Sequence, residues 1–443
     1  MSRYDTALKY FNEQKELTDV RVKSGIELYR KGDVKITVKD KDGNPVKGAK
    51  VFVSLKNHEF RFGANVFMLD EFECEEKNKA YREDFAKLFN IATIPFYWSD
   101  LEPERGKPRY AKDSPKIYRR PATDLCVEYC LENGIEPKCH CLNYDNFTPD
   151  WAKGVTVDEQ KRMLTERFRS LSEKYADIIP TWEVTNETLQ GFNAPRTKFY
   201  FQDDFVDWSF RMADKFFPNN RLIINDYYIW EVGQFMNSRS AYYMQIEKLM
   251  RDGITHLDSI GMQYHSFFPL DKEPDLAKTR YNPKHLYNVL DRYAMLGKKL
   301  QITEMTIPAY SANTEDEDIQ AELLCNFYKV CFSHPAMEAI IYWNLVDGYA
   351  AFAPQGDMTS GENIYHGGLV RFDMTKKAGY HALYNLIHKE WHTELETGTD
   401  DGGMAGFRGF YGDYEIKVIA DGKEYTEAVL VSEKKNNSFT ITL

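Results

Sequence analysis

The chain has 443 residues, of which 43% are hydrophobic and 14% aromatic, and its formal net charge at pH 7 is -11. This length suits one large domain with a small one, and the hydrophobic content is sufficient for a sizeable core. The acidic balance and the lack of a long basic run argue against nucleic acids and anionic membrane surfaces as partners.

The first predicted element is a helix over residues 18–32, which Gly32 is expected to end. Two alternating runs follow within residues 33–55, on either side of an Asp-Gly-Asn-Pro turn, and this pattern predicts a β-hairpin. Residues 414–432 and 437–443 also read as strands, the first of them around an Asp-Gly turn. Pieces this small are not stable alone. We therefore expect residues 33–60 and 404–443 to form one small β-sandwich, next to a helical segment at residues 1–32.

Between these ends, strand-like and helix-like segments alternate. The predicted strands span residues 59–67, 91–96, 135–142, 178–186, 221–227, 259–265, 300–305 and 339–346. The predicted helices span residues 78–89, 122–133, 157–175, 204–217, 238–253, 283–297, 317–332 and 379–391. This alternation predicts an α/β protein that closes into a (β/α)8 TIM barrel over residues 61–396. An open doubly wound sheet is the alternative, and the lack of a Gly-rich phosphate loop after any strand disfavours it.

Polar side chains gather where the predicted strands end. Two carboxylic acids, Glu187 in TWEVTNET and Glu304 in KKLQITEMTIPAY, each stand at the end of a hydrophobic strand. The other groups at strand ends are His140, Asn186, Asn225, Asp226, Tyr227, Gln263, His265, Trp343, Asn344 and Asp347. Active sites of such barrels lie at the carboxyl ends of the strands, so we expect these side chains at one mouth.

Two carboxyl groups among amides and aromatic rings are what glycoside cleavage requires. One gives a proton to the leaving oxygen, and the other attacks the anomeric carbon. Phosphoryl transfer would need Lys, Arg or a metal ion at the mouth, which these strand ends lack. A metal hydrolase built on His140, His265 and Asp226 is a further alternative. Cys139 and Cys141 flank His140, but the spacing fits no common zinc pattern, and we expect no metal or other cofactor.

Several segments also resemble a known family. WEVTNE looks like the motif Trp-Asp-x-x-Asn-Glu, and ITEMTI looks like Ile-Thr-Glu-Leu-Asp. LIINDYY, IGMQYH, WSDLEPERG and LVRFDMTKKAGYHAL resemble further segments of the same family, each on the expected strand or loop. On these motifs, residues 62–391 resemble glycoside hydrolase family 10, the endo-β-1,4-xylanases. The resemblance implies a TIM barrel and a retaining mechanism with a covalent glycosyl-enzyme.

The resemblance also implies roles for individual residues. Glu187 is expected to be the general acid/base, and Glu304 the nucleophile. Asn186 is expected to bind the sugar 2-hydroxyl, His265 to orient Glu304, and Gln263 to lie beside the acid/base. The remaining residues expected to bind substrate are Tyr97, Trp98, His140, Tyr144, Tyr227 and Trp343.

The departures from the family pattern concern sugar recognition. Tyr97 stands where the family carries a Lys, and the neighbouring Glu-Asn pair is missing. The other departures are Tyr144 for Trp, Asp145 for His, Thr306 for Asp, and Ala351 or Phe352 for a sugar-facing Trp. Loss of such polar partners shifts substrate preference. The expected partner is therefore a β-linked plant polysaccharide or oligosaccharide: xylan, or a different or decorated β-glycan. A glycan-binding barrel with impaired catalysis is the alternative.

The remaining expectations concern location and the terminal sandwich. No apolar segment reaches the length of a membrane span, and the start MSRYDTALKYFNEQ lacks the apolar region of a secretory signal. We expect either a secreted protein whose signal has been removed or a cytoplasmic one that acts on imported oligosaccharides. Seven cysteines, an odd number, disfavour a disulfide framework. Phe407, Phe410 and Tyr411 could stack on glycan, but we favour packing at a domain seam. The sequence sets no oligomeric state.

Overall fold

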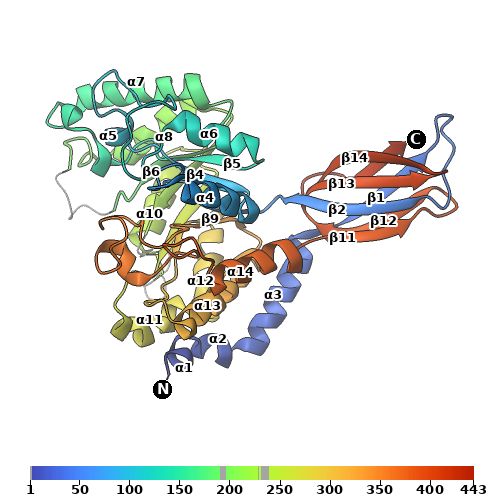
Figure 1. The fold of residues 1–443 in the computed structure, drawn as a ribbon. Coiled ribbons are helices and arrows are strands. Elements are labelled where there is room, and N and C mark those ends of the chain that lie inside the picture. Colours follow the sequence, from blue (N-terminus) through green and yellow to red (C-terminus); the bar gives the residue numbers. More distant parts are fainter. Residues whose placement is uncertain (1, 190–195, 228, 231–238) are drawn as a thin grey trace.

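The computed structural model describes residues 2–189, 196–227, 229–230 and 239–443. It has two parts, a closed barrel wrapped by helices and a smaller pair of sheets set to one side (Figure 1). Three N-terminal helices, α1 (Arg3–Ala7), α2 (Lys9–Glu13) and α3 (Lys15–Tyr29), run along the outside of the barrel.

The barrel consists of eight parallel strands in chain order. They are β3 (Arg61–Asn65), β4 (Ile91–Pro95), β5 (Glu136–His140), β6 (Thr181–Asn186), β7 (Arg221–Asp226), β8 (Ser259–His265), β9 (Lys299–Thr306) and β10 (Met337–Tyr342). Pairing of β10 with β3 closes the sheet. β4 and β6 are buried along their whole length, as expected for strands covered on both faces. The predicted (β/α)8 fold is confirmed.

Helices cover the outside of these strands. They are α4 (Glu75–Leu88), α5 (Trp98–Leu101), α6 (Thr123–Glu132), α7 (Val157–Tyr175), α8 (Phe205–Phe216), α10 (Ala241–Arg251), α11 (Glu273–Arg280), α12 (Pro283–Ala294), α13 (Thr314–Ser333) and α14 (Ala378–Asn385). Residue 238, the predicted start of the helix seen as α10, lies outside the described residues. α8 buries Phe205, Val206, Phe210 and Ala213 on one face, the pattern of an amphipathic helix. Within the described part of the chain, no helix is both long enough and apolar enough to span a membrane.

The N-terminal segment differs from its prediction at Gly32. The helix α3 ends at Tyr29, and Gly32 lies inside strand β1 (Lys31–Lys39) instead of stopping the helix. The need for glycine has a different cause: a Cβ atom at this position would come within 2.6 Å of the Tyr411 ring. The segment is held to the barrel by Arg3, whose Nε lies 2.9 Å from Glu273 Oε2 and whose Nη1 lies 2.8 Å from Asp316 Oδ1.

The smaller part consists of two sheets built from both ends of the chain. One sheet has the order β12 (Met404–Phe410), β1, β15 (Ser438–Thr442). The other has the order β11 (Glu394–Gly398), β2 (Lys50–His58), β13 (Gly412–Ala420), β14 (Lys423–Val431). Alternate side chains of β1 and β13 are buried, as in a sandwich whose inner faces form the core. β11 runs across residue 396, which was expected to end the barrel domain.

The predicted hairpin over residues 33–55 is wrong, because β1 and β2 lie in different sheets. The turn itself forms: Asp40 Oδ1 accepts a hydrogen bond of 2.8 Å from Asn44 N, and Gly43 has φ +84°. Pairing then stops after the bridge between Lys39 and Pro45. Proline has no N–H to extend a ladder, so the chain leaves β1 and enters the second sheet.

The sandwich sits against the amino-terminal ends of the barrel strands. Phe410 packs edge-on against His58, with ring centroids 5.6 Å apart, and lies 6.1 Å from Phe332. Phe407 and Phe410 are 9% and 3% exposed, so they pack in the protein interior and offer no glycan platform. This face of the barrel is opposite the carboxyl ends of the strands, where barrel active sites lie.

Candidate active site

A cavity of about 740 Å³ opens at the carboxyl ends of the barrel strands. Its lining includes the predicted residues Tyr97, His140, Tyr144, Asn186, Glu187, Tyr227, Gln263, His265, Glu304 and Trp343. These residues come from seven different strand ends and are far apart in the sequence. The barrel therefore brings the expected polar and aromatic groups to one place.

Glu187 follows the last residue of β6 and turns away from the strand. Its φ of +51° lies in the left-handed region, which is uncommon for a residue other than glycine. Gln263 Nε2 donates to Glu187 Oε1 at 3.1 Å, and the Tyr144 hydroxyl donates to Oε2. Strained backbone of this kind is found where neighbouring contacts fix a functional side chain. Here the contacts hold the carboxyl group at the cavity surface.

Glu304 lies in β9 and is 4% exposed. Asn225 Nδ2 donates to its Oε1 at 2.9 Å, and His265 Nε2 lies 3.1 Å from Oε2. Nδ1 of the same histidine lies 3.1 Å from Thr306 Oγ1. Burial raises the pKa of Glu304 to about 8, and the nearby negative charge of Glu187 adds to the effect. Burial lowers the pKa of His265 to about 4, so this histidine is neutral at pH 7.

A chain of hydrogen bonds links the two carboxyl groups. Asn186 Oδ1 accepts from Gln263 Nε2 at 3.2 Å and from Asn225 Nδ2 at 2.8 Å. Gln263 in turn binds Glu187, and Asn225 binds Glu304. Because the side-chain oxygen of Asn186 takes both bonds, its amide nitrogen is the group left to meet a ligand. The two acids and the amide between them thus form one connected unit.

Below this unit lies a buried ionic cluster. Glu183, which is fully buried, accepts from Lys138 Nζ at 2.6 Å and faces His140 Nδ1 at 2.7 Å. The other nitrogen of His140, Nε2, lies 2.9 Å from the Tyr97 hydroxyl. Burial opposes ionisation of Glu183, but Lys138 and His140 outweigh it and lower the pKa of this carboxyl to about 2. The cluster fixes the His140 ring against the cavity floor.

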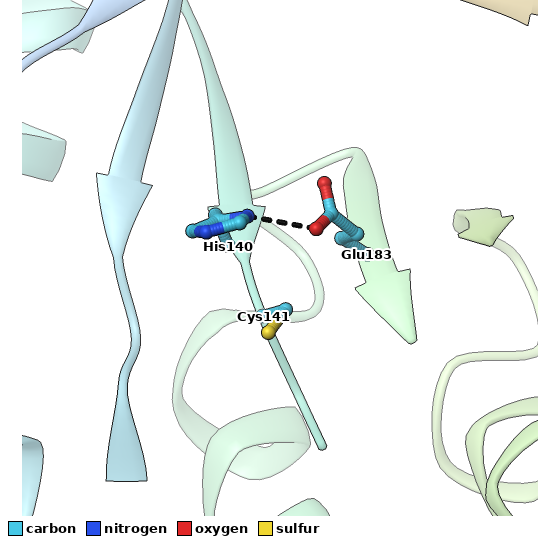
Figure 2. A group of neighbouring side chains, drawn as sticks. All are labelled: His140, Cys141 and Glu183. Atoms are coloured by element: carbon cyan, nitrogen blue, oxygen red, sulfur yellow. Dashed lines mark hydrogen bonds and ion pairs between the residues drawn. The ribbon is translucent and has the colours of Figure 1, made fainter. Parts of the chain in front are cut away.

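This cluster contains the one group of possible metal ligands found in the described residues, His140, Cys141 and Glu183 (Figure 2). Figure 2 shows the His140 ring facing the Glu183 carboxylate. A cation here would meet the Lys138 ammonium, which already holds Glu183. Burial also raises the pKa of the Cys141 thiol well above its usual range, which disfavours the thiolate that binds metals. These residues do not fit a metal site.

The expected alternative metal group of His140, His265 and Asp226 is not brought together. Asp226 Oδ1 accepts from Tyr227 N at 2.8 Å, and Oδ2 accepts from Leu189 N at 3.2 Å, so its carboxylate binds the start of the loops after β7 and β6. Asp347 is likewise engaged, in an ion pair with buried Lys377.

Trp98 was expected to bind substrate, and the structure places it elsewhere. Its Nε1 donates to Glu102 Oε2 at 3.0 Å, and its ring packs edge-on against Trp151 at 5.3 Å. Tyr97, the residue before it, does line the cavity. Tyr97 precedes α5 and Trp98 begins it, so the two side chains point in different directions, and the sequence did not indicate which of them faces the cavity.

Aromatic rings line the wall around His140. Phe67, Tyr97 and Trp343 form a separate buried cluster with Tyr144, Phe147 and Phe267 at its edge. Tyr97 stacks on Phe147, with ring centroids 4.1 Å apart. Sequence reasoning missed Phe67, Phe147 and Phe267. Two of them had a signal, because Phe67 and Phe267 each stand two residues after the last residue of a barrel strand.

Four charged lining residues were also missed: Arg119, Arg120, Arg280 and Glu362. Arg280 is the last residue of α11. The other three belong to the long connections after β4 and β10, where no periodic pattern marks which side chains face inward.

The family model described as Glycosyl hydrolase family 10 matches residues 59–380, well over half of the chain. The chain belongs to glycosyl hydrolase family 10. Among curated relatives, the anti-sigma-I factor RsgI6 of Acetivibrio thermocellus is 25% identical over 404 residues, which cover 90% of this chain and 46% of that protein. Endo-1,4-beta-xylanase 2 of Arabidopsis thaliana is 23% identical over 427 residues, or 93% of this chain and 34% of that protein. The present chain thus spans less than half the length of each of these two relatives.

Solved structures of the family share the barrel. Xylanase 10B of Thermotoga petrophila, in complex with xylobiose, superposes with a TM-score of 0.59 at 23% identity, over 75% of this chain and 95% of that one. Native xylanase 10B of Thermotoga maritima gives a TM-score of 0.58 at 24% identity, over 75% and 96% of the two chains. These likenesses establish the fold.

Proposed function

We propose that this protein is a retaining glycoside hydrolase that cleaves internal β-1,4 linkages of xylan or xylo-oligosaccharides. The observation that carries the proposal is the pair of carboxyl groups, Glu187 and Glu304, on one cavity and linked through Asn186 by hydrogen bonds. Membership of glycosyl hydrolase family 10 and several relatives named as endo-1,4-beta-xylanases support the choice of substrate. In a retaining enzyme the two carboxyl groups stand about 5–5.5 Å apart.

In the first step, the Glu304 carboxylate attacks the anomeric carbon while the bond from that carbon to the leaving oxygen breaks. Glu187 gives its proton to the leaving oxygen, so the departing sugar leaves as an alcohol. Asn225 Nδ2 and His265 Nε2 sit at hydrogen-bond distance from the Glu304 oxygens and fix the direction of attack. The product of this step is a glycosyl ester on Glu304.

In the second step, a water molecule attacks the anomeric carbon of this ester. Glu187, now ionised, takes a proton from the water, and Glu304 leaves as the carboxylate. Two inversions return the β configuration. Through both steps the amide nitrogen of Asn186 is placed to donate to a sugar hydroxyl, because its oxygen is already occupied.

The residues that depart from the family pattern shape the same cavity. Tyr97 stacks on Phe147 and binds His140 through its hydroxyl, so an aromatic wall stands where a Lys would supply a donor. Tyr144 binds the acid Glu187 directly. We infer that the cavity keeps β-glycoside chemistry while the sugars next to the cleaved one are recognised differently from those of an unsubstituted xylan chain.

A second candidate is a glycan sensor without significant turnover. The relative named as an anti-sigma-I factor favours it, because that name describes a regulatory protein. The cavity and its aromatic wall would serve binding equally well.

Turnover decides between the two. The purified protein is incubated with linear β-1,4-xylo-oligosaccharides and with an aryl β-xyloside, and proton NMR follows the configuration of the first product. We expect hydrolysis with β product formed first, and loss of all turnover in Glu304→Gln. First appearance of α product would exclude the retaining mechanism. Binding without hydrolysis, in the parent protein as in Glu304→Gln, would favour the sensor.

A further inference from the structure

Arg119 is a buried cation on the cavity wall that forms no close ion pair with a carboxylate of the described residues, although the charge of Glu362 acts on it from further away. It is 4% exposed, and its φ of +62° is in the left-handed region. Nη1 donates to Asn344 Oδ1 at 3.0 Å and to the Tyr349 carbonyl oxygen, both neutral acceptors. A guanidinium has five N–H donors, and a buried charge normally has an ionic partner. Arg119 therefore has N–H donors beyond the two bonds of Nη1, and in the described residues its charge is offset only from a distance, by Glu362.

The two charged residues near Arg119, Arg120 and Glu362, each have another partner in the protein. Arg120 lines the same cavity, but its Nε lies 2.7 Å from Asp100 Oδ2, and its guanidinium lies 4.2 Å from the centre of the Tyr97 ring. Glu362 is separated from Arg119 by Asn344, whose Nδ2 donates to Glu362 Oε2 at 3.2 Å. Burial raises the pKa of Glu362, and the charge of Arg119 opposes this shift without cancelling it.

Arg119 is also connected to the reacting centre by a continuous wall. Its guanidinium lies 5.7 Å from the centre of the Phe67 ring. Phe67 packs against Trp343 with centroids 5.3 Å apart, and Trp343 packs against His265, the partner of Glu304, at 5.6 Å. A substrate that lies along this wall with its reacting carbon at Glu304 reaches Arg119 with a group beyond the sugar that is cleaved.

We propose that Arg119 binds the carboxylate of an acidic sugar carried by the substrate, such as a uronic acid branch on a β-1,4-xylose backbone. The inference rests on the proposed function for the backbone, and adds an anionic substituent as part of what the cavity recognises. The planar guanidinium matches the two oxygens of a carboxylate, and Asn344 and the Tyr349 carbonyl hold it in place. Arg280 also lines the cavity, with its guanidinium 5.3 Å from the centre of the Tyr264 ring.

Binding is measured by calorimetry in the Glu304→Gln protein, which cannot consume the probes. Three oligosaccharides of equal length are compared: an unbranched one, one with a glucuronic acid branch, and one whose branch carboxyl has been reduced to a hydroxymethyl group. We expect the acidic probe to bind at least ~10-fold more tightly than the reduced one, as for a desolvated bidentate pair. We also expect 0.5 M NaCl to weaken the acidic probe selectively.

Variants then assign the effect to this residue. Arg119→Met should remove the preference for the acidic probe, and Arg119→Lys should retain only part of it. Arg162→Met, which removes the same charge from an exposed site, should retain it fully. Equal affinity of the acidic and reduced probes for the parent protein would overturn the proposal, as would an unchanged preference in Arg119→Met. If Arg119→Met does not fold, the reduced probe and the salt dependence still decide.

Failure of the proposed function has a separate signature. If the proposed function is wrong, the unmodified protein will not hydrolyse the unbranched oligosaccharide, whichever probe it binds more tightly. A carboxylate preference without hydrolysis would support the anion site and reject the enzyme.

Discussion

The pair formed by Lys138 and Glu183 offers a sharp test of how the site is held together. Both side chains are essentially inaccessible, at 1% and 0% exposed, and Nζ lies 2.6 Å from Oε2. Glu183→Gln keeps the shape of the side chain but removes its charge, which leaves a buried ammonium without a counter-ion. Breaking a buried pair in this way costs about 3–5 kcal/mol of unfolding free energy.

The double variant Lys138→Met/Glu183→Gln removes both charges. Buried ion pairs replaced by neutral groups of similar volume are often as stable as the original. We therefore expect the double variant to recover most of the loss. Lys138→Met alone should cost less than Glu183→Gln, because the remaining carboxylate keeps two polar partners, His140 Nδ1 at 2.7 Å and Asn225 Nδ2 at 3.2 Å.

The assay is guanidinium unfolding at pH 7, followed by tryptophan fluorescence, with all four proteins measured together. The coupling energy comes from the double-mutant cycle. An unfolding free energy of Glu183→Gln within about 1 kcal/mol of the parent value would refute the reasoning, since an unpaired buried ammonium is expected to destabilise the protein by more than that. A double variant no more stable than Glu183→Gln would show that the loss comes from shape or hydrogen bonding and not from charge.

Three further outcomes follow from the structure. Glu187→Ala should lower kcat/KM on xylo-oligosaccharides by about 10²–10⁴ but spare aryl xylosides, whose leaving groups need little protonation; equal losses on both would contradict its role as the acid. The folded protein holds a proton on Glu304 up to about pH 8, whereas the unfolded chain releases it near 4.5. The unfolding free energy should therefore fall by a few kcal/mol as pH rises from about 4.5 to about 8. Glu304→Gln should lose this pH dependence, and a flat stability profile in the parent protein would contradict the raised pKa of Glu304. Arg3→Met leaves Glu273, which is 1% exposed, without its cation, so amide exchange in residues 3–13 should accelerate while the barrel core stays protected; unchanged exchange there would show that Arg3 does not anchor the segment.

The barrel and the central residues of its site could be predicted because each rests on a local pattern. Eight apolar strands alternate with helices; Glu187 directly follows β6, and Glu304 lies near the end of β9. Because active-site residues of a barrel lie at the carboxyl ends of its strands, both acids are expected at one mouth. The observed contacts of Gln263 with Glu187 and of His265 with Glu304 agree with the family resemblance.

What the sequence did not indicate depends on contacts that are distant along the chain. The Asp-Gly-Asn-Pro turn predicted a hairpin, but partners from the C-terminal residues pair with β1 and β2 instead. Glu183 and Lys138 sit inside strands, where a charged side chain reads as a solvent-facing one until its partner on the next strand is known. Arg119 lies in an irregular loop, so its inward direction is set by Asn344 and Tyr349, which lie more than 200 residues further along the chain.

The arrangement of the small sheets has a consequence for how the protein is made. β1 and β2 are inner strands, and all of their neighbours, β12 and β15 for one and β11 and β13 for the other, follow the barrel in the sequence. During translation both strands leave the ribosome with two open edges each, and these edges stay uncovered until the whole barrel has followed. Open edges recruit other strands, so the nascent chain is exposed to mispairing until residues 394–442 have been made. Termination directly after the barrel would leave a product prone to aggregation even though its cavity is complete.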